Sequence, residues 1–212
     1  MSSTLFTRRP ATAPVAGRAA SGAPGHVGLV IAVALLVALG GCAQKVTYKD
    51  IADPNGLYHF KVRSDWQSTL LNDVNLVYAS DELPATDKLA DTLTLAVYAS
   101  YEATEVPLAE QLENVIERRA ENRRWKSYER SEATSVTVGG REGVAIDVSG
   151  IDANGAEFEA RFYLVRAGDR QVGFIAVAPA GKLAEFDAEL NAIVTERWFW
   201  HGTLGGETTK TP

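Results

Sequence analysis

The sequence predicts an α+β domain built on a central antiparallel sheet of about six or seven strands, with helices packed on its faces. Apolar and polar residues alternate over several short runs, which is typical of half-buried strands. Glycine-containing pairs separate some of these runs, at the spacing of β-hairpin turns. Two other segments have apolar residues at helical spacing. Strands followed by an occasional helix favour the α+β class.

The first strand covers residues 57–62. Tyr58, Phe60 and Val62 lie at alternate positions, so they share one face, which we expect to be buried. His59 falls on the opposite face. A lone histidine at such a position is more often structural than functional, and a metal-binding or catalytic role is the alternative.

A turn at 65–66 follows, and two further strands are predicted over 75–79 and 92–98. The second of these is apolar on both faces. It therefore indicates a sheet that is covered on both sides.

Pro107 opens a helix, because its fixed φ and missing N–H suit a first turn. The helix carries one amphipathic stripe at Leu108, Leu112, Val115, Ile116 and Arg119. Arginines gather near its C-terminal end, where the helix dipole favours cations. We interpret these residues as a solvated helix end and not as a nucleic-acid patch: Arg118, Arg119, Arg123 and Arg124.

Hairpin strands then occupy most of the chain up to residue 178. The predicted strands are 131–138, one containing Val144, Ile146 and Val148, then 158–165 and 171–178, with turns at 139–140, 152–155 and 168–169. From Ala180 the apolar period becomes helical, and this helix is expected to end near Arg197. The residues 198–200 close the domain.

The N-terminal 41 residues read as a signal peptide and not as part of the fold. Three arginines and no acidic residue precede a 13-residue apolar run at 27–39. As a helix this run rises about 20 Å, against about 30 Å for a hydrocarbon core, so it is too short to span a membrane comfortably.

Cys42 is the one cysteine of the chain, and with 39–41 it forms the sequence Leu-Gly-Gly-Cys. This pattern resembles a bacterial lipobox, which implies cleavage between Gly41 and Cys42 and acylation of the Cys42 thiol. The alternative is a free cysteine after an ordinary signal peptide. Ala43, in place of aspartate, favours the outer membrane if the organism has two membranes. We therefore predict a lipid-anchored protein on the extracytoplasmic face of the cell membrane.

Cleavage would leave 171 residues, with 27 acidic and 18 basic side chains and a formal charge of −9. This charge argues against nucleic acid as a partner. The bilayer, reached through acylated Cys42, and an unknown protein are the partners we expect. The predicted organisation is a signal peptide over 1–41, a tether over 42–54, the domain over 55–201 and a disordered tail over 202–212.

Several motifs of the chain resemble the PsbP-like superfamily, whose members include a photosystem II extrinsic protein and lipidated bacterial relatives. The resemblance spans 54–200 and rests on 55–66, 138–143, 174–179 and 193–199. It implies an α/β/α sandwich around an antiparallel sheet. The turn at 63–66 lacks the proline and glycine of the family pattern, and the resemblance does not imply a photosynthetic role.

The sequence contains no catalytic motif of a common hydrolase, metalloprotease or P-loop enzyme. A loop over 80–91 carries carboxylates that are weak candidates for a divalent metal such as calcium: Asp81, Glu82, Asp87 and Asp91. Tryptophans at positions 66, 125, 198 and 200 more often close a core than line a ligand cleft. His201 is expected to fray with the tail.

These observations favour a non-enzymatic, membrane-anchored lipoprotein without a cofactor. Its PsbP-like domain would bind a partner protein or assist an envelope complex. The alternative is a surface module that binds a small molecule or a divalent metal.

Overall fold

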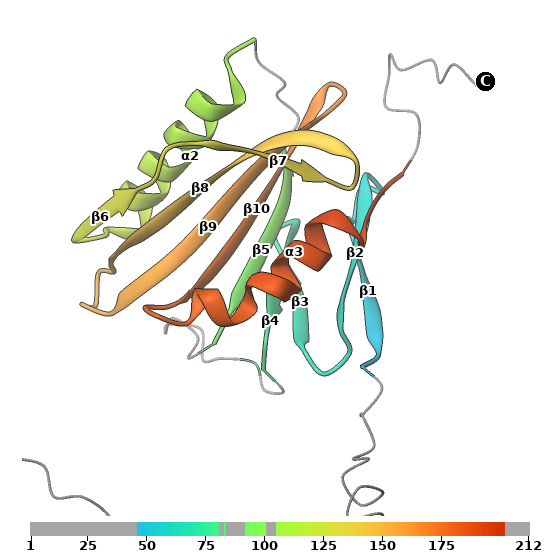
Figure 1. Ribbon diagram of the computed structural model, residues 1–212, viewed down its shortest axis with the longest axis horizontal. Helices are drawn as coiled ribbons and strands as arrows, with labels where there is room; N and C mark the ends of the chain where they lie inside the picture. The colour runs from blue at the N-terminus through green and yellow to red at the C-terminus, as the bar shows by residue number, and fades with distance from the viewer. Residues whose placement is uncertain (1–45, 81–82, 84–91, 101–104, 202–212) are drawn as a thin grey trace, which may run out of the picture. The chain divides into compact units, whose positions relative to one another are not determined.

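The computed structural model describes residues 46–80, 83, 92–100 and 105–201, and these form two antiparallel sheets and two α-helices (Figure 1). The strands are β1 (Tyr48–Ala52), β2 (Tyr58–Arg63), β3 (Gln67–Leu71), β4 (Val74–Tyr78), β5 (Thr94–Ser100), β6 (Ser127–Arg130), β7 (Thr134–Val138), β8 (Arg141–Ile151), β9 (Glu157–Ala167), β10 (Arg170–Pro179) and β11 (Trp198–Trp200). The helices are α2 (Leu108–Arg123), η1 (Leu183–Phe186), which is a 3-10 turn, and α3 (Asp187–Thr195).

The larger sheet has eight strands in the order β3-β4-β5-β10-β9-β8-β6, with β7 also paired to β8. Its middle is made by β8, β9 and β10, which are consecutive and joined by short turns. Tight turns suit long antiparallel neighbours, because each strand returns directly beside the one before it. The predicted antiparallel α+β fold is confirmed, with eight strands in the large sheet where about six or seven were expected, and with the predicted strand at 57–62 in a second sheet.

Helices cover both faces of this sheet. Along β10, Phe174 points into the core beneath α3, which buries Leu190 and Ile193. The next residue, Ile175, joins the core on the other face, where α2 buries Leu112 and Ile116. Alternate side chains of one strand thus reach two separate cores, as the period of two requires. Figure 1 shows α3 in front of the sheet and α2 on its other side, which is the α/β/α arrangement that the resemblance implies.

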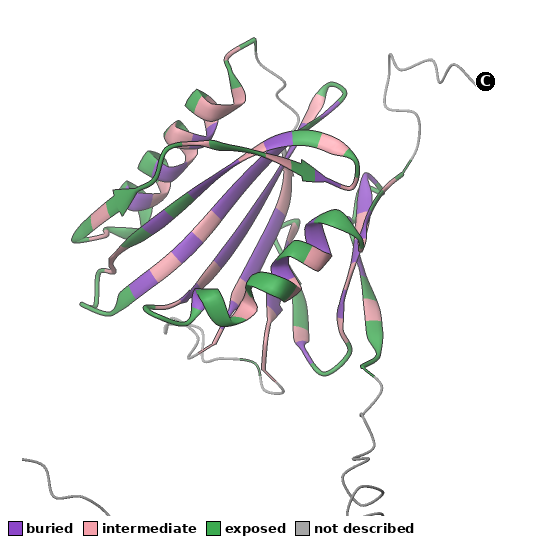
Figure 2. Ribbon diagram, in the orientation of Figure 1, coloured by how far each residue is buried: buried purple, intermediate pink, exposed green. Residues whose placement is uncertain are grey.

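The smaller sheet has the order β1-β2-β11 and packs its inner face on the core that α3 covers. Tyr58, Phe60 and Val62 are buried there, so the predicted alternation of this strand is confirmed. The ring of Trp198 stacks on Tyr58 with 4.9 Å between the ring centroids and on Phe60 with 5.1 Å. These contacts join β11 to β2, and the ring of Trp198 also lies 6.1 Å from that of Phe174 in β10. Figure 2 shows buried residues along the central strands of the large sheet.

Several elements were not predicted or differ in their bounds from the sequence-based expectation. Strands β3 and β6 are largely exposed and show no buried alternation, which removes the signal for a half-buried strand. The expected tether over 42–54 is too long, because β1 pairs with β2 and buries Ile51. The last helix ends at Thr195, two residues before Arg197, as predicted, and a turn at 196–197 leads directly into β11.

The signal peptide, Gly41, Cys42 and the tail over 202–212 lie outside the described residues, so the anchor stays a prediction. Within the ranges that the structure describes, no helix is long and apolar enough to cross a membrane.

Candidate functional site

The outward-facing side of the small sheet gathers aromatic and charged side chains, with Asp50 of β1 opposite Lys61 of β2. We call this surface the outer face and define it by Tyr48 from β1, His59 and Lys61 from β2, and Arg197 and Phe199 at β11. It arises because residues alternate along each strand: Tyr58, Phe60 and Trp198 point into the core, so their neighbours point out.

Two large rings of the outer face remain accessible to solvent, since Tyr48 is 46% exposed and Phe199 is 40% exposed. The guanidinium carbon of Arg197 lies 4.5 Å from the centre of the Tyr48 ring, and Lys61 Nζ lies 5.8 Å from the centre of the Phe199 ring. Exposed tyrosine, phenylalanine and arginine side chains are characteristic of the centres of protein interfaces. The outer face can therefore bury aromatic area against a partner, while its Arg197 guanidinium is already paired with Glu189 of α3 at 2.8 Å.

His59 points away from the core, as predicted, and stacks on Phe199 with 4.7 Å between the ring centroids. The expectation that His201 frays is wrong. Its backbone N–H donates to the Leu57 carbonyl oxygen at 2.9 Å, and its imidazole contacts His59. This pairing extends β11 by one residue and holds the edge of the outer face in place.

Within the described ranges, the two histidines and a nearby third ligand do not form a metal site. Asp50 Oδ1 lies 3.8 Å from His59 Nε2, and across the described ranges no group of three or more His, Cys, Asp or Glu side chains is placed to hold a metal ion. The acidic-loop candidates, positions 81, 82, 87 and 91, lie outside those ranges.

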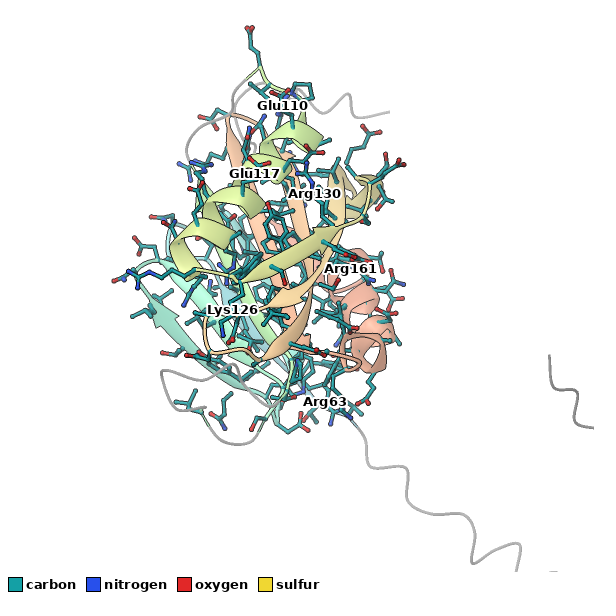
Figure 3. All side chains as sticks on the ribbon, turned by 90° about the vertical axis from the view of Figure 1, so that its left-hand side faces the viewer. Arg63, Glu110, Glu117, Lys126, Arg130 and Arg161 are labelled. Atoms are coloured by element: carbon teal, nitrogen blue, oxygen red, sulfur yellow. The ribbon has the colours of Figure 1, made fainter. Side chains whose placement is uncertain are left out.

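A polar groove of about 430 Å³ lies on the α3 side of the sheet, beside η1 and the first residue of α3. Arg161 from β9 occupies it and donates to both carboxylate oxygens of Asp147, at 2.6 and 3.1 Å, and to Asp187 of α3 at 2.9 Å. The hydrogen bonds to Asp147 raise the pKa of Arg161 well above its usual range. Arg161, Asp147 and Asp187 are thus paired with one another and link β8, β9 and α3; Arg161 is labelled in Figure 3.

The tryptophans close the core, as the sequence favours. Trp66 and Trp198 are buried in the core under α3, and Trp200 packs against it. Trp125 packs against the other core, with its ring 4.6 Å from that of Phe158. Neither the polar groove nor the groove beside α2 described below is lined by a tryptophan.

Sequence reasoning missed the outer face because Tyr48 fell in the expected tether and Phe199 in a short closing segment. One signal was available in the tripeptide 198–200. Its outer residues are tryptophans and its middle residue is phenylalanine, and a strand places that phenylalanine on the opposite side from both.

No protein-family profile matches the sequence, and no curated protein matches it. Several solved structures share its fold, among them CyanoP, LpqN and Mog1p. CyanoP, the PsbP of Synechocystis sp. PCC 6803, is 10% identical, and the match covers 77% of this chain and 99% of CyanoP with a TM-score of 0.55. LpqN of Mycobacterium tuberculosis, which is involved in cell envelope biogenesis, is 12% identical over 75% of this chain and 93% of LpqN, with a TM-score of 0.52.

The Ran-binding protein Mog1p of Saccharomyces cerevisiae is 16% identical, and the match covers 74% of this chain and 96% of Mog1p with a TM-score of 0.51. At these identities the likeness concerns the fold, and it agrees with the resemblance that the sequence motifs carry. The domain of this chain has the PsbP-like fold that CyanoP, LpqN and Mog1p share.

Proposed function

We propose that this chain is an extracytoplasmic lipoprotein whose PsbP-like domain is a non-enzymatic binding module, and that a partner protein docks on the outer face. The exposed pair of Tyr48 and Phe199, each with a cation beside its ring, carries the proposal. Aromatic rings flanked by arginine or lysine give both apolar burial and cation–π contacts at an interface.

The position of the predicted anchor supports a partner at the membrane. Val46 lies four positions after Cys42, and an extended chain spans at most about 3.6 Å per residue. An acylated Cys42 would hold Val46 within about 15 Å of the lipid surface. Strand β1, and with it Tyr48, would then lie close to membrane proteins and to other envelope components.

The shared fold supports the binding role. Mog1p is a Ran-binding protein, and LpqN is involved in cell envelope biogenesis. The charged groups at the centre of the polar groove support a structural assignment for that groove, because Arg161, Asp147 and Asp187 are bound to one another. We therefore place the function of the domain in binding and not in catalysis.

The anchor is tested by Cys42→Ala in cells fed a labelled fatty acid. We expect the wild-type chain to take up the label and to run at the size of a protein that lacks 41 residues. The variant should stay unlabelled and unprocessed. A Cys42→Ala chain that still reaches the mature size and partitions into detergent would contradict the lipobox interpretation.

The docking surface is tested by co-purification from detergent-solubilised membranes. Tyr48→Ala combined with Phe199→Ala should lower recovery of the partner roughly tenfold or more, because aromatic residues at interface centres often contribute 2 kcal/mol or more each. Leu70→Ala combined with Leu71→Ala is the matched control, since these two exposed residues lie in β3 of the other sheet. Equal recovery with both double variants would rule out the outer face.

A further inference from the structure

A second groove, separate from the outer face, lies between α2 and the sheet at β5, β9 and β10. Its volume is about 580 Å³, within the range of small-molecule sites. Its walls include the side chains of Tyr98, Val115 and Leu164. Three arginines also line it, namely Arg118, Arg119 and Arg123. The described residues that line it include no aspartate or glutamate.

Arg119 is the informative member of this set, because it is half-buried without a counter-ion. The structure gives it no hydrogen bond or ion pair within the described ranges, whereas Arg118 Nε donates to the Asn114 carbonyl oxygen at 3.4 Å. Burial lowers the pKa of the Arg119 guanidinium, and the charge of Arg123 lowers it further. Burying an unpaired charge is unfavourable, so a group that supplies negative charge here would stabilise the site.

Other arginines of the domain do have a carboxylate as counter-ion. Arg130 pairs with Glu113 of α2 at 3.1 Å, and Arg161 and Arg197 pair with carboxylates at 2.9 Å or less. The chain has 27 acidic residues, yet none of those that the structure describes lines this groove. The groove is therefore a positive site in an acidic domain.

The dipole of α2 does not by itself explain why Arg119 lies beside Arg123 in this groove. The helix dipole favours cations in the last turn, which explains Arg123 and the capping residue Arg124. Arg119 lies one turn earlier, and its i,i+4 relation to Arg123 places two like charges side by side, which destabilises an isolated helix. A bound anion between them would convert this repulsion into two attractive contacts.

We propose that the groove between α2 and strands β5, β9 and β10 binds an amphipathic anion. Arg119 and Arg123 hold its phosphate or carboxylate group, and Val115 and Leu164 contact its apolar body. Guanidinium groups suit this role, because their planar fork matches the oxygens of phosphate and carboxylate. Gln111 and Gln171 also line the groove, and the Gln171 side-chain amide donates to the Gln111 side-chain oxygen at 2.5 Å.

The test is calorimetric titration of the full chain, purified in a neutral detergent, with hexyl phosphate. Hexanol and inorganic phosphate are the matched probes for the apolar body and for the anion alone. We expect hexyl phosphate to bind and each of the other two to bind at least roughly tenfold more weakly. Equal affinity for hexanol or for inorganic phosphate would overturn the amphipathic assignment, and no binding of hexyl phosphate would overturn the site.

The variants locate the site. Arg119→Gln and Arg123→Gln should each raise the Kd for hexyl phosphate roughly tenfold, as expected for the loss of a charged hydrogen bond. Arg124→Gln is the control: it removes the same charge from the same helix end, and Arg124 does not line the groove. Circular dichroism confirms folding of each variant before titration. An equal effect of Arg124→Gln would mean general charge attraction and would overturn the proposed site.

A lipid and a soluble compound could both supply this chemistry, and competition distinguishes them. If phosphatidic acid in mixed micelles displaces hexyl phosphate more effectively than phenyl phosphate does, the natural ligand belongs to the membrane. The reverse order assigns a soluble phosphate ester. Failure of both competitors to displace hexyl phosphate would overturn the proposal.

Discussion

The imidazole rings of His59 and His201 are in direct contact, with 2.6 Å between His59 Nδ1 and His201 Nε2 and 4.5 Å between the ring centroids. The two residues are 142 positions apart in the chain. His59 also stacks on Phe199, so the pair connects the last residue of the domain to the ring that the outer face presents. This contact fixes the geometry of the surface that we assign to partner binding.

His201→Ala should lower the free energy of unfolding by about 0.5–1.5 kcal/mol, because it removes one hydrogen bond and a ring stack. Urea unfolding followed by circular dichroism measures the change. His59→Ala and the double variant complete a cycle, in which we expect a coupling of about 0.5 kcal/mol or more. Strict additivity of the two single changes would show that the contact contributes nothing.

Gly139 and Gly140 form the β7–β8 turn, and both have positive φ, at 53° and 81°. A Cβ at Gly139 would lie 2.8 Å from Trp198 Cδ1 and 3.0 Å from the Trp198 carbonyl oxygen, whereas one at Gly140 meets nothing within 4 Å. Gly140→Ala should cost about 1 kcal/mol from backbone strain alone, and Gly139→Ala about 2 kcal/mol more. Similar unfolding midpoints for the two variants would contradict the close approach of β11 to this turn.

Burial raises the pKa of three tyrosines, Tyr58, Tyr98 and Tyr163, and raises that of Tyr58 the most. The folded state keeps these phenols neutral, while in the unfolded chain they ionise near pH 10. Above pH 10 the folded state therefore binds more protons, and stability falls as pH rises, by up to about 1.4 kcal/mol per pH unit for each group. Below pH 10 these tyrosines leave stability unchanged.

Urea unfolding at a series of alkaline pH values tests this expectation, together with the ultraviolet absorbance of tyrosinate. Tyr58→Phe should make the decline above pH 10 shallower. Ionisation of Tyr58 before any loss of circular dichroism would be incompatible with its burial.

Arg161 joins three elements through Asp147 and Asp187, and its side chain is more buried than those of its partners. Arg161→Met should lower the free energy of unfolding by about 1–2 kcal/mol, since two partly exposed carboxylates lose a charged donor. Arg161→Lys should restore little of this loss, because an ammonium cannot bind Asp147 through two parallel hydrogen bonds. Full rescue by lysine, measured by urea unfolding, would show that charge alone matters here.

The antiparallel sheet could be predicted from the sequence, because the signals for strands and turns are local. The alternation at Tyr58, Phe60 and Val62 and the paired glycines at 139–140 each report burial or turn geometry within a few residues. The strands β3 and β6 escaped prediction because they lie at edges of the large sheet, where few of their side chains are buried. Their conformation depends on hydrogen bonds to neighbouring strands.

The candidate surfaces depend on contacts between distant segments, which a single sequence does not reveal. Tyr48 meets Arg197, and His59 meets His201, only after β2 pairs with β1 on one edge and with β11 on the other. The arginines near the end of α2 were visible as a cluster, but their charge alone fits a solvated helix end. Once α2 packs on the sheet, Arg119 is partly buried, and the cluster is better interpreted as the proposed anion site than as a solvated helix end.

Site-specific photo-crosslinking in intact cells tests partner binding at the outer face most directly. A photoreactive phenylalanine analogue replaces Phe199 in one chain and Leu71 in a control chain, because both side chains are exposed and they lie on different sheets. We predict one discrete protein adduct from position 199 that is absent from position 71 and is lost when Tyr48→Ala is added. The same protein adducts from both positions, or lipid adducts alone from position 199, would contradict a protein-binding outer face.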